Sequence, residues 1–501
     1  MTSFLRSILL LLWITIPLSI FPQTGDLERV SPESQGISSA DVKAYFDAML
    51  SCPTGEPHGL MILRHGKVVG EFFPQPFEPN QPQLLYSAAK TFTGLAVILA
   101  IEENRLKLSD RVATFFPEQL PDSISDHLAS MTVRDLLTMT SGIQPDPLMR
   151  TTGAEWIRRY LGKPVSQPGE VFHYDSMCSY LLSAIVQRVT GEKLLAYLQK
   201  KIFDPLHIST VDWEESPEGI NTGGWGLRMH VESLAKFGQL LLNKGEWEGK
   251  RLVSPEWVEE MTSSLQETGM ADTYGYHTWR CDYPNAYRAD GALGQYIIVA
   301  PDEEMVVAIT QANSSNGVAE RQLVWKLLRQ AKKEPLPESS AYTALLQTQN
   351  SSSLPVASAK KRRTRCQSLL LDKQASLGTN GLEWRTLRLE SAQKDSLRLT
   401  VTTTAGKTYT LSAGQGKWHT NQTDVYPPYT IKAVGRFQGI HPPFSVASCF
   451  GEDNEQLTIK VRYTNWGFGA DLLFRITEGQ LSLKVKENGK REAYNVPIEL
   501  E

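Results

Sequence analysis

The order of strand-like and helix-like segments in the first 330 residues constrains the fold most strongly. Two β-rich runs around a glycine-containing turn, residues 59–64 and 68–73, predict a hairpin near the start. Apolar residues at helical spacing fill the middle, and strand patterns return at 289–300 and 305–310 before a helix at 318–332. Strands that open and close a unit predict a mixed α/β (α+β) fold, in which an antiparallel sheet carries an inserted helical lobe.

The composition changes after residue 334. Residues 335–365 are rich in Pro, Ser and Gln and predict a linker with one weak helix. From residue 366 to residue 501, apolar and polar side chains alternate with period two between Gly and Asn turns, as in Leu397–Val401. We therefore expect one domain at 26–334 and an all-β domain, a sandwich or a barrel, at 366–501.

The first residues, 1–22, are typical of an export signal. Arg6 supplies the positive charge that precedes the nearly continuous apolar run Ile8–Phe21. This run is shorter than the roughly 20 residues that a membrane span needs. The pattern favours a cleaved signal, with an uncleaved membrane anchor as the alternative, and predicts a periplasmic or extracellular protein associated with the cell envelope.

Charge and cysteine spacing exclude several classes of function. The net charge is −4 with both signs interspersed, which argues against a nucleic-acid-binding protein. The five cysteines are widely separated and form no C-x-x-C pair, so zinc and dithiol redox sites are not expected. An odd number of cysteines leaves at least one free thiol. We expect no metal and no cofactor, and the sequence does not predict the oligomeric state.

A Ser-x-x-Lys tetrad stands at the start of one predicted helix. It places the hydroxyl of Ser87 and the amine of Lys90 one helical turn apart, as a base-activated serine nucleophile requires. The same spacing begins at three other serines, Ser233, Ser358 and Ser391, so the tetrad alone decides nothing. The tetrad at Ser233 lies in an amphipathic helix, and the other two lie in the predicted linker and β domain.

Companion segments distinguish the first tetrad from the others. Tyr174–Ser176 follows a Pro-Gly-Glu-x-Phe stretch, and residues 289–292 (Ala-Asp-Gly-Ala) open a predicted strand. Together with a helix-and-turn segment at 132–142 and a Gly-rich segment at 223–229, they resemble the β-lactamase-related serine hydrolases. That superfamily includes class C β-lactamases, penicillin-binding carboxypeptidases, D-aminopeptidases, certain esterases and nylon-oligomer hydrolases. The resemblance covers about residues 55–330 and implies a β-lactamase/transpeptidase-like fold.

The resemblance implies that Ser87 is the nucleophile and that Lys90 and Tyr174 carry protons. A serine hydroxyl is a weak nucleophile until a base removes its proton. The positive end of the helix disfavours a charged Lys90, which pushes its amine towards neutrality. A tyrosine near pKa 10 needs a decrease of about 3 units to ionise at neutral pH, and a nearby ammonium favours that decrease. The sequence leaves open which of the two residues takes the serine proton.

The resemblance also suggests how the substrate is held. It assigns the oxyanion hole to the backbone N–H groups of Ser87 and Ala292, next to Gly291. Ser176 and Asp290 are candidate substrate contacts. His173 is expected to be structural, because the site already has its proton carriers.

Two departures from the family pattern bear on the substrate. Ala289 stands where penicillin-recognising members carry Lys or His, and Arg288 is expected on the opposite face of the strand. Ser176 stands where many members carry Asn. We therefore predict an exported serine hydrolase that forms an acyl-enzyme on a small or peptide-like ester or amide. A cell-wall D-amino-acid peptidase is the first alternative, and a catalytically silent binding protein that uses the cleft is the second.

Overall fold

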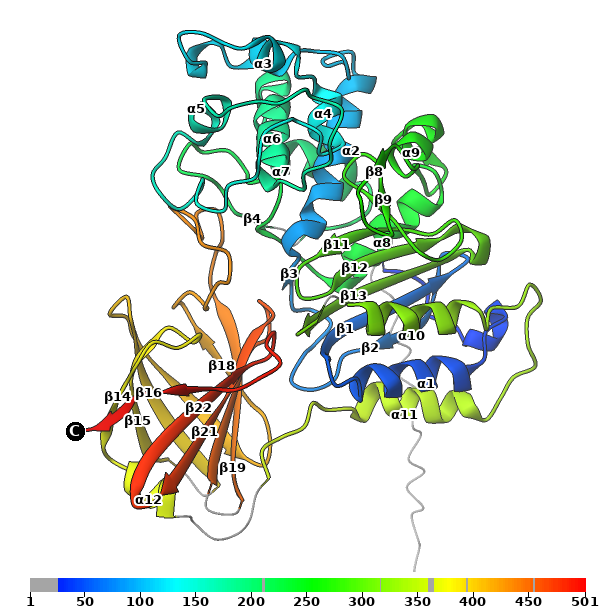
Figure 1. Cartoon of the computed structure of the whole chain (residues 1–501). Helices are drawn as coiled ribbons and strands as arrows, with labels where there is room; N and C mark the ends of the chain where they lie inside the picture. The colour runs from blue at the N-terminus through cyan, green and yellow to red at the C-terminus, as the bar shows by residue number, and fades with distance from the viewer. Residues whose placement is uncertain (1–25, 210–211, 316, 359–364, 393–394, 454–455) are drawn as a thin grey trace, which may run out of the picture.

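The computed structural model describes the chain from residue 26 to residue 501, except residues 210–211, 316, 359–364, 393–394 and 454–455. The predicted export signal at 1–22 lies outside the described residues. A mixed α/β unit with a protruding helical lobe comes first, and a β domain follows beside it (Figure 1). None of the helices that the structure describes is long and apolar enough to cross a membrane.

An antiparallel sheet of eight strands forms the centre of the first unit, in the order β2-β1-β13-β12-β11-β10-β9-β8. Its strands are β1 (Gly55–Arg64), β2 (Lys67–Phe72), β8 (Gln266–Glu267), β9 (Thr273–Tyr274), β10 (Trp279–Arg280), β11 (Tyr287–Gly291), β12 (Gln295–Ala300) and β13 (Met305–Asn313). The strand nearest the N-terminus pairs with the last one, with Leu60 opposite Ile309. The predicted sheet, completed by both ends of the unit, is confirmed.

Helices cover both faces of this sheet (Figure 1). They are α1 (Ser39–Leu50) and α10 (Val318–Leu328) on one face and α8 (Val231–Leu242) on the other. Side chains alternate along β1, so that Leu60 and Ile62 join the core under α1 and α10. Met61 and Leu63 point the other way and join the larger core that continues into the helical lobe.

The helical lobe is built around α2 (Ala89–Glu102), which runs from the sheet into the lobe (Figure 1). Residues 89–100 of α2 are all buried, as expected for a helix that is apolar on every side. The other helices of this part are α3 (Asp126–Ser130), α4 (Val133–Leu137), α5 (Trp156–Leu161), α6 (Ser176–Thr190), α7 (Leu194–Leu198) and α9 (Pro255–Met261). Short strands complete it: β3 (Gln83–Leu84), β4 (Asp212–Trp213), β5 (Leu227–Met229), β6 (Glu246–Trp247) and β7 (Lys250–Arg251).

Part of the predicted linker belongs to the first unit. Within residues 335–365, helix α11 (Ala341–Ser351) packs against α1. Leu345 is 1% exposed and joins the core under α1, whereas its neighbour Leu346 is 39% exposed. The Pro, Ser and Gln composition conceals this helix, because Leu345 is its single buried residue and leaves no apolar stripe in the sequence.

The C-terminal domain is a single sheet of eleven strands. After α12 (Arg365–Leu370) its strands are β14 (Gln374–Leu377), β15 (Trp384–Ser391), β16 (Ser396–Thr403), β17 (Thr408–Gln415), β18 (His419–Thr423), β19 (Phe444–Asp453), β20 (Gln456–Tyr463), β21 (Phe468–Thr477), β22 (Gln480–Glu487), β23 (Tyr494–Val496) and β24 (Ile498–Leu500). Consecutive strands β23 and β24 stand at opposite ends of the sheet order, so the sheet curls almost closed. Of the two predicted alternatives, the barrel-like one is observed. All five cysteines are free.

Truncating the docked side chain of α11 tests whether this helix is part of the fold. Leu345→Ala is expected to lower the free energy of unfolding of the first unit by about 2–5 kcal/mol, because it leaves a cavity in a closed core. The exposed neighbour supplies the control, since Leu346→Ala should change the free energy of unfolding by less than about 0.5 kcal/mol. Urea denaturation followed by tryptophan fluorescence measures both. Equal effects of the two substitutions would contradict docking of α11.

Candidate active site

Ser87 lies at the junction between the sheet and the helical lobe. It is the middle residue of a short 3-10 turn, η2 (Tyr86–Ala88), that leads into α2. Tyr86, just before it, has φ +48°, a left-handed conformation that costs a non-glycine residue about 1 kcal/mol or more. The turn leaves Ser87 partly exposed while Lys90, one helical turn later, is 1% exposed.

The amine of Lys90 contacts three oxygen atoms. Its Nζ lies 3.1 Å from Ser87 Oγ, 3.1 Å from Ser176 Oγ and 2.7 Å from the backbone oxygen of Gly224. It also lies 4.9 Å from the centre of the Tyr174 ring. The structure therefore brings together Ser87, Lys90, Tyr174 and Ser176, which lie in two separate segments of the sequence.

The surroundings of Lys90 weaken its basicity. Burial lowers the pKa of Lys90 to about 7, the positive charge of Arg150 lowers it further, and Asp175 opposes the shift. No ion pair joins Lys90 to a carboxylate in the part of the chain that the structure describes. Much of the amine is therefore neutral at neutral pH.

The pKa of Tyr174 rises, whereas ionisation at neutral pH would require it to fall. Burial raises the pKa of Tyr174 above its usual value, and the Ser87 side chain offsets this only in part. The expectation that an ammonium beside it lowers the tyrosine pKa is not met, because Lys90 itself loses much of its charge. Tyr174 keeps its proton, and Lys90 is the member of the pair that is able to accept one.

Strand β11 lies directly against the nucleophile turn. A Cβ atom at Gly291 would lie 2.2 Å from the oxygen of Leu85 and 3.1 Å from the nitrogen of Ala88, so only glycine fits. Neighbouring β10 pairs with Tyr287 and Arg288 alone. The edge of β11 beyond them is open towards Ser87, and the exposed Ala292 follows at its end.

Asp290 and Arg288 bind each other. Arg288 Nε donates to Asp290 at 2.8 Å, and its Nη2 donates to Asp272, also at 2.8 Å. The Arg288 side chain is 4% exposed, and Ala289 joins the apolar core on the other face. The two carboxylates hold Arg288, so β11 presents no unpaired cation at the site.

His173 lies outside this cluster. Its backbone N–H donates to the oxygen of Met139, and its ring accepts from Gln144 Nε2 at 2.8 Å. The other nearby histidine, His277, is buried in the lobe, where burial and the Lys90 amine lower its pKa to about 3. Its Nδ1 donates to the oxygen of Leu137 at 3.0 Å. Neither histidine contacts Ser87.

Sequence reasoning missed the acceptor that holds Lys90. Gly224 belongs to the Gly-rich segment at 223–229, which packs so closely on α6 that a Cβ at Gly223 would lie 2.5 Å from the oxygen of Ser179. The glycine run was a usable signal for close packing. Nothing in the sequence signalled that the Gly224 oxygen would point at the amine.

Arg150 was also missed. Its guanidinium lies 5.0 Å from the centre of the Trp225 ring, next to Gly224. Its Nε donates to the oxygen of Lys432 in the β domain at 3.2 Å, and its own oxygen accepts from the N–H of Val434 at 2.8 Å. The partner residues are more than 280 positions away, which no local pattern reveals.

The β domain also reaches Tyr86, the residue before Ser87. Residues 424–443, between β18 and β19, extend to the helical lobe (Figure 1). In this segment Thr430 Oγ1 donates to Tyr86 Oη at 3.4 Å, and the rings of Tyr429 and Tyr86 are 6.5 Å apart. Side chains of the β domain therefore contact the left-handed Tyr86.

Aromatic side chains form one wall beside Tyr174. The centre of the Tyr174 ring lies 5.7 Å from that of Trp279 and 6.4 Å from that of Tyr274. Phe172 packs edge-on against Trp279 and Tyr274. Trp279 and Phe172 remain partly exposed. The site thus combines a polar cluster with an apolar wall. No group of three or more side chains suited to a metal ion occurs among the described residues.

Comparison with known proteins identifies the family and the fold. A family model described as Beta-lactamase matches residues 58–332. The 6-aminohexanoate-dimer hydrolase of Paenarthrobacter ureafaciens is 28% identical over 234 residues, 42% of this chain and 58% of that protein. Protein flp of Staphylococcus aureus (strain COL) is 28% identical over 146 residues, 28% of this chain and 29% of that protein. The chain thus spans less than two thirds of either relative.

A solved structure shares the fold. It is that of a proposed 6-aminohexanoate-dimer hydrolase from Bacillus anthracis, which superposes on this chain with a TM-score of 0.51 at 19% sequence identity. The match covers 60% of this chain and 85% of that one. At this identity the likeness shows a common architecture.

The protonation of Lys90 is directly measurable. In isotope-labelled protein, the Lys90 side-chain NMR signal, assigned by its loss in Lys90→Met, is expected to titrate near pH 7. Arg150→Gln should raise this pKa, because it removes a like charge. Arg188→Gln, on the exposed surface of the same lobe, should leave it unchanged. A wild-type value near that of free lysine, about 10.4, would contradict the assignment.

Proposed function

Because the chain belongs to the beta-lactamase family, we propose that it is a serine hydrolase that forms an acyl-enzyme through Ser87 on an ester or amide substrate. One observation carries the proposal. A buried amine of lowered pKa, Lys90 Nζ, lies 3.1 Å from the Ser87 hydroxyl without a carboxylate partner. This is the arrangement that a general base needs in order to activate a serine near neutral pH.

The first step follows from the bonds around Lys90. A neutral amine has two N–H donors and one lone pair. The donors are engaged by the Gly224 oxygen and Ser176 Oγ, which leaves the lone pair for the Ser87 proton. As the proton moves to the amine, Ser87 Oγ bonds to the substrate carbonyl carbon and the carbonyl electrons move to its oxygen. In this scheme Ser176 positions the base.

Backbone N–H groups of Ser87 and Ala292 stabilise the resulting oxyanion in the proposed site. The open edge of β11 beside the nucleophile turn supports this assignment. One such donor is worth roughly 3 kcal/mol in the transition state. When the intermediate collapses, the bond to the leaving group breaks and its alcohol or amine receives a proton. Tyr174, protonated and next to Ser87, is suited to donate that proton while it takes one from Lys90, which returns the amine to its neutral form.

Hydrolysis of the acyl-enzyme completes the reaction. Water attacks the ester carbonyl carbon while Lys90, again neutral, accepts its proton. Collapse breaks the bond to Ser87 Oγ, which regains a proton from Lys90, and the acid product leaves. No oxidant, reductant or second substrate besides water is required.

The walls of the site favour an uncharged acyl group. Arg288 is tied to two carboxylates and Ala289 carries no charge, so β11 offers no cation to a substrate carboxylate. Trp279 and Phe172 provide an apolar surface instead. The Paenarthrobacter relative is named for a dimer of an amino acid, which is joined through an amide. A linear ester or amide with an apolar acyl chain fits these features better than a penicillin.

Export is part of the proposal. The apolar run Ile8–Phe21 after Arg6 supports a protein that works outside the cytoplasm, where small esters and peptide-like amides of the cell envelope are available as substrates. Detection of the protein in periplasmic or culture fractions, with its N-terminus sequenced, tests this part separately from the chemistry.

Two serines with the same tetrad spacing provide a matched test. Ser87→Ala is expected to abolish labelling by a fluorophosphonate probe and to lower kcat/KM for a nitrophenyl ester by at least about 10⁴-fold. Ser233→Ala, in the buried tetrad of α8, should retain both. Labelling that survives in Ser87→Ala, or no serine-dependent turnover of any substrate by the wild type, would leave the silent binding protein as the better reading.

The choice of substrates separates the enzyme classes. The same pair of variants is incubated with a nitrophenyl ester, a linear amide, labelled penicillin and a muropeptide. Turnover of the ester or amide without penicillin labelling agrees with the proposal. Penicillin labelling together with muropeptide cleavage would favour the D-amino-acid peptidase.

Substitution at Gly291 tests the assignment of the oxyanion edge. Gly291→Ala is expected to lower kcat by about 10²-fold or more, because the new Cβ displaces the nucleophile turn from β11. The control is Gly55→Ala in β1, where the nearest atom is the flexible Glu320 side chain at 3.0 Å. Initial rates of ester hydrolysis measure both. Unchanged kcat in Gly291→Ala would contradict this placement of the oxyanion site.

A further inference from the structure

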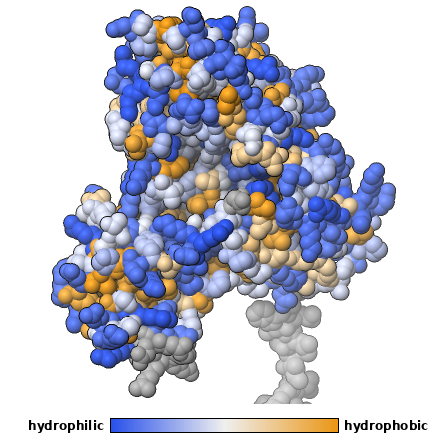
Figure 2. Space-filling model, in the orientation of Figure 1, coloured by the Kyte–Doolittle hydropathy of each residue, from blue (hydrophilic) through white to orange (hydrophobic). Residues whose placement is uncertain are grey.

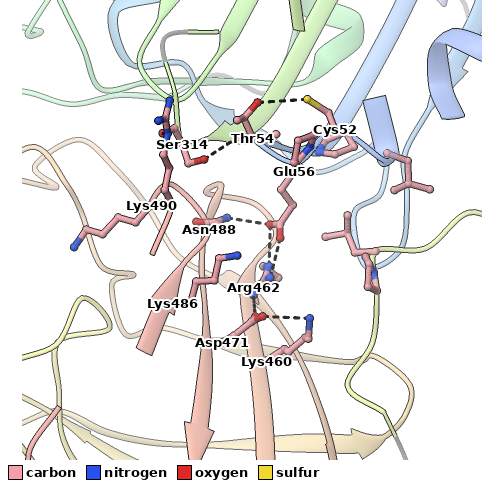
Figure 3. A pocket seen from close by; sticks show the side chains of 17 residues that line it. Cys52, Thr54, Glu56, Ser314, Lys460, Arg462, Asp471, Lys486, Asn488 and Lys490 are labelled. Atoms are coloured by element: carbon pink, nitrogen blue, oxygen red, sulfur yellow. Dashed lines mark hydrogen bonds and ion pairs between the residues drawn. The ribbon is translucent and has the colours of Figure 1, made fainter. Parts of the chain in front are cut away.

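A pocket of about 600 Å³ lies between the two domains (Figure 3). The segment that enters β1 forms one side of it, and strands β20, β21 and β22 with the turn after β22 form the other. No residue of the candidate active site lines it. Its volume is within the range of small-molecule sites, roughly 300–1,000 Å³.

A buried ion network forms the floor of this pocket (Figure 3). Arg462 binds Glu56 through two hydrogen bonds of 2.8 and 2.7 Å and binds Asp471 at 2.9 Å. Asn488 donates to Glu56 at 3.1 Å. The Arg462 side chain is only 5% exposed, and the pKa of Glu56 is held well below its usual value, mainly by Arg462 against the effect of burial. These charges are therefore compensated and join the domains rigidly.

The cationic side chains that line the pocket outnumber the acidic ones, and every cationic one comes from the β domain. Five cationic and two acidic side chains line it, an excess of three positive charges in a chain of net charge −4. The cations are Lys460, Arg462, Lys486, Lys490 and Arg491. Lys460 shares Asp471 with Arg462, and Lys490 pairs with Glu487.

Two of these cations have no carboxylate partner. Arg491 Nε donates to the backbone oxygen of Ser314 at 3.3 Å, which leaves both of its Nη groups for other acceptors. Lys486 lines the pocket beside Asn488 and Arg462 (Figure 3). Within the described ranges, neither forms an ion pair with a carboxylate.

The opposite wall is mixed. It carries apolar side chains from the first unit and from the connecting segment, Leu50, Pro53, Pro57, Leu354 and Pro355, together with Cys52, Thr54 and Ser314. Leu354 is 3% exposed and is fixed by its N–H bond to the oxygen of Gln75 at 2.7 Å. The cationic side of the pocket therefore faces a wall that is partly apolar.

We propose that this pocket binds an organic anion. A carboxylate or phosphate group of the ligand contacts Lys486 and Arg491, where charge-assisted hydrogen bonds are strong. Its apolar body lies against Leu354 and the prolines opposite, so that it leaves water. Because the ligand touches both domains, binding raises the melting temperature of the docked arrangement. This site is independent of the chemistry proposed for Ser87.

Titration of the full-length chain with phenyl phosphate, inorganic phosphate and phenol tests the two walls separately. Isothermal calorimetry is expected to show saturable binding of phenyl phosphate, with inorganic phosphate at least about tenfold weaker and phenol weaker still. Benzoate in place of phenyl phosphate decides whether the site prefers a carboxylate or a phosphate. Ser87→Ala should bind phenyl phosphate like the wild type, which separates this pocket from the active site.

Substitution of the two unpaired cations supplies the second arm. The double variant Lys486→Gln/Arg491→Gln should lose at least about tenfold in affinity for phenyl phosphate while its ligand-free melting temperature stays unchanged. Lys484→Gln, on the same strand but outside the pocket, is the matched control and should bind normally. No saturable binding by the wild type, or equal losses in the control and the double variant, would overturn the proposal.

Discussion

The candidate site depends on the burial of the Lys90 amine. Moving its pKa from 10.5 to about 7 costs the fold roughly 5 kcal/mol whenever the amine is protonated in both the folded and the unfolded chain. Stability therefore rises with pH between those two values and lacks that contribution below pH 7. A carboxylate at ion-pair distance would remove the cost, and with it the neutral amine. The neutral oxygens of Ser87, Ser176 and Gly224 satisfy Lys90 without restoring its charge.

The β domain contributes to the lowered pKa of Lys90. Arg150 contributes a like charge that lowers the Lys90 pKa, and backbone groups of Lys432 and Val434 hold Arg150 in place. The same segment of the β domain contacts Tyr86, whose left-handed conformation aims Ser87 at the site. Backbone strain of this kind persists only where surrounding contacts maintain it. Both the position of the proposed nucleophile, Ser87, and the pKa of the proposed base, Lys90, are thus tied to residues beyond the β-lactamase-like unit.

Local patterns in the sequence were sufficient for the parts of the site that local structure determines. The hairpin at 59–73, the helix after Ser87 and the opposite faces of Ala289 and Arg288 follow from periodicity, and the structure has all three. The direction of the Tyr174 pKa shift depends on burial, which the sequence does not reveal. In the structure burial raises this pKa, whereas ionisation at neutral pH requires a lower one. Arg150 was beyond reach for another reason, since its partners lie more than 280 residues away.

The β domain contacts both the unit with the central sheet and the helical lobe. Arg462 binds Glu56, at the start of the central β1, whereas Gln438 accepts from the N–H of Glu215 in the helical lobe at 2.7 Å. The sheet carries Gly291 at the proposed oxyanion edge, and the lobe carries Tyr174. The nearly closed sheet is a stiff body, because all its strands except β18 and those at the two ends are paired on both sides. By contacting both parts, this domain holds the proposed proton carriers at a set distance from the proposed oxyanion edge, as the proposed acyl transfer requires.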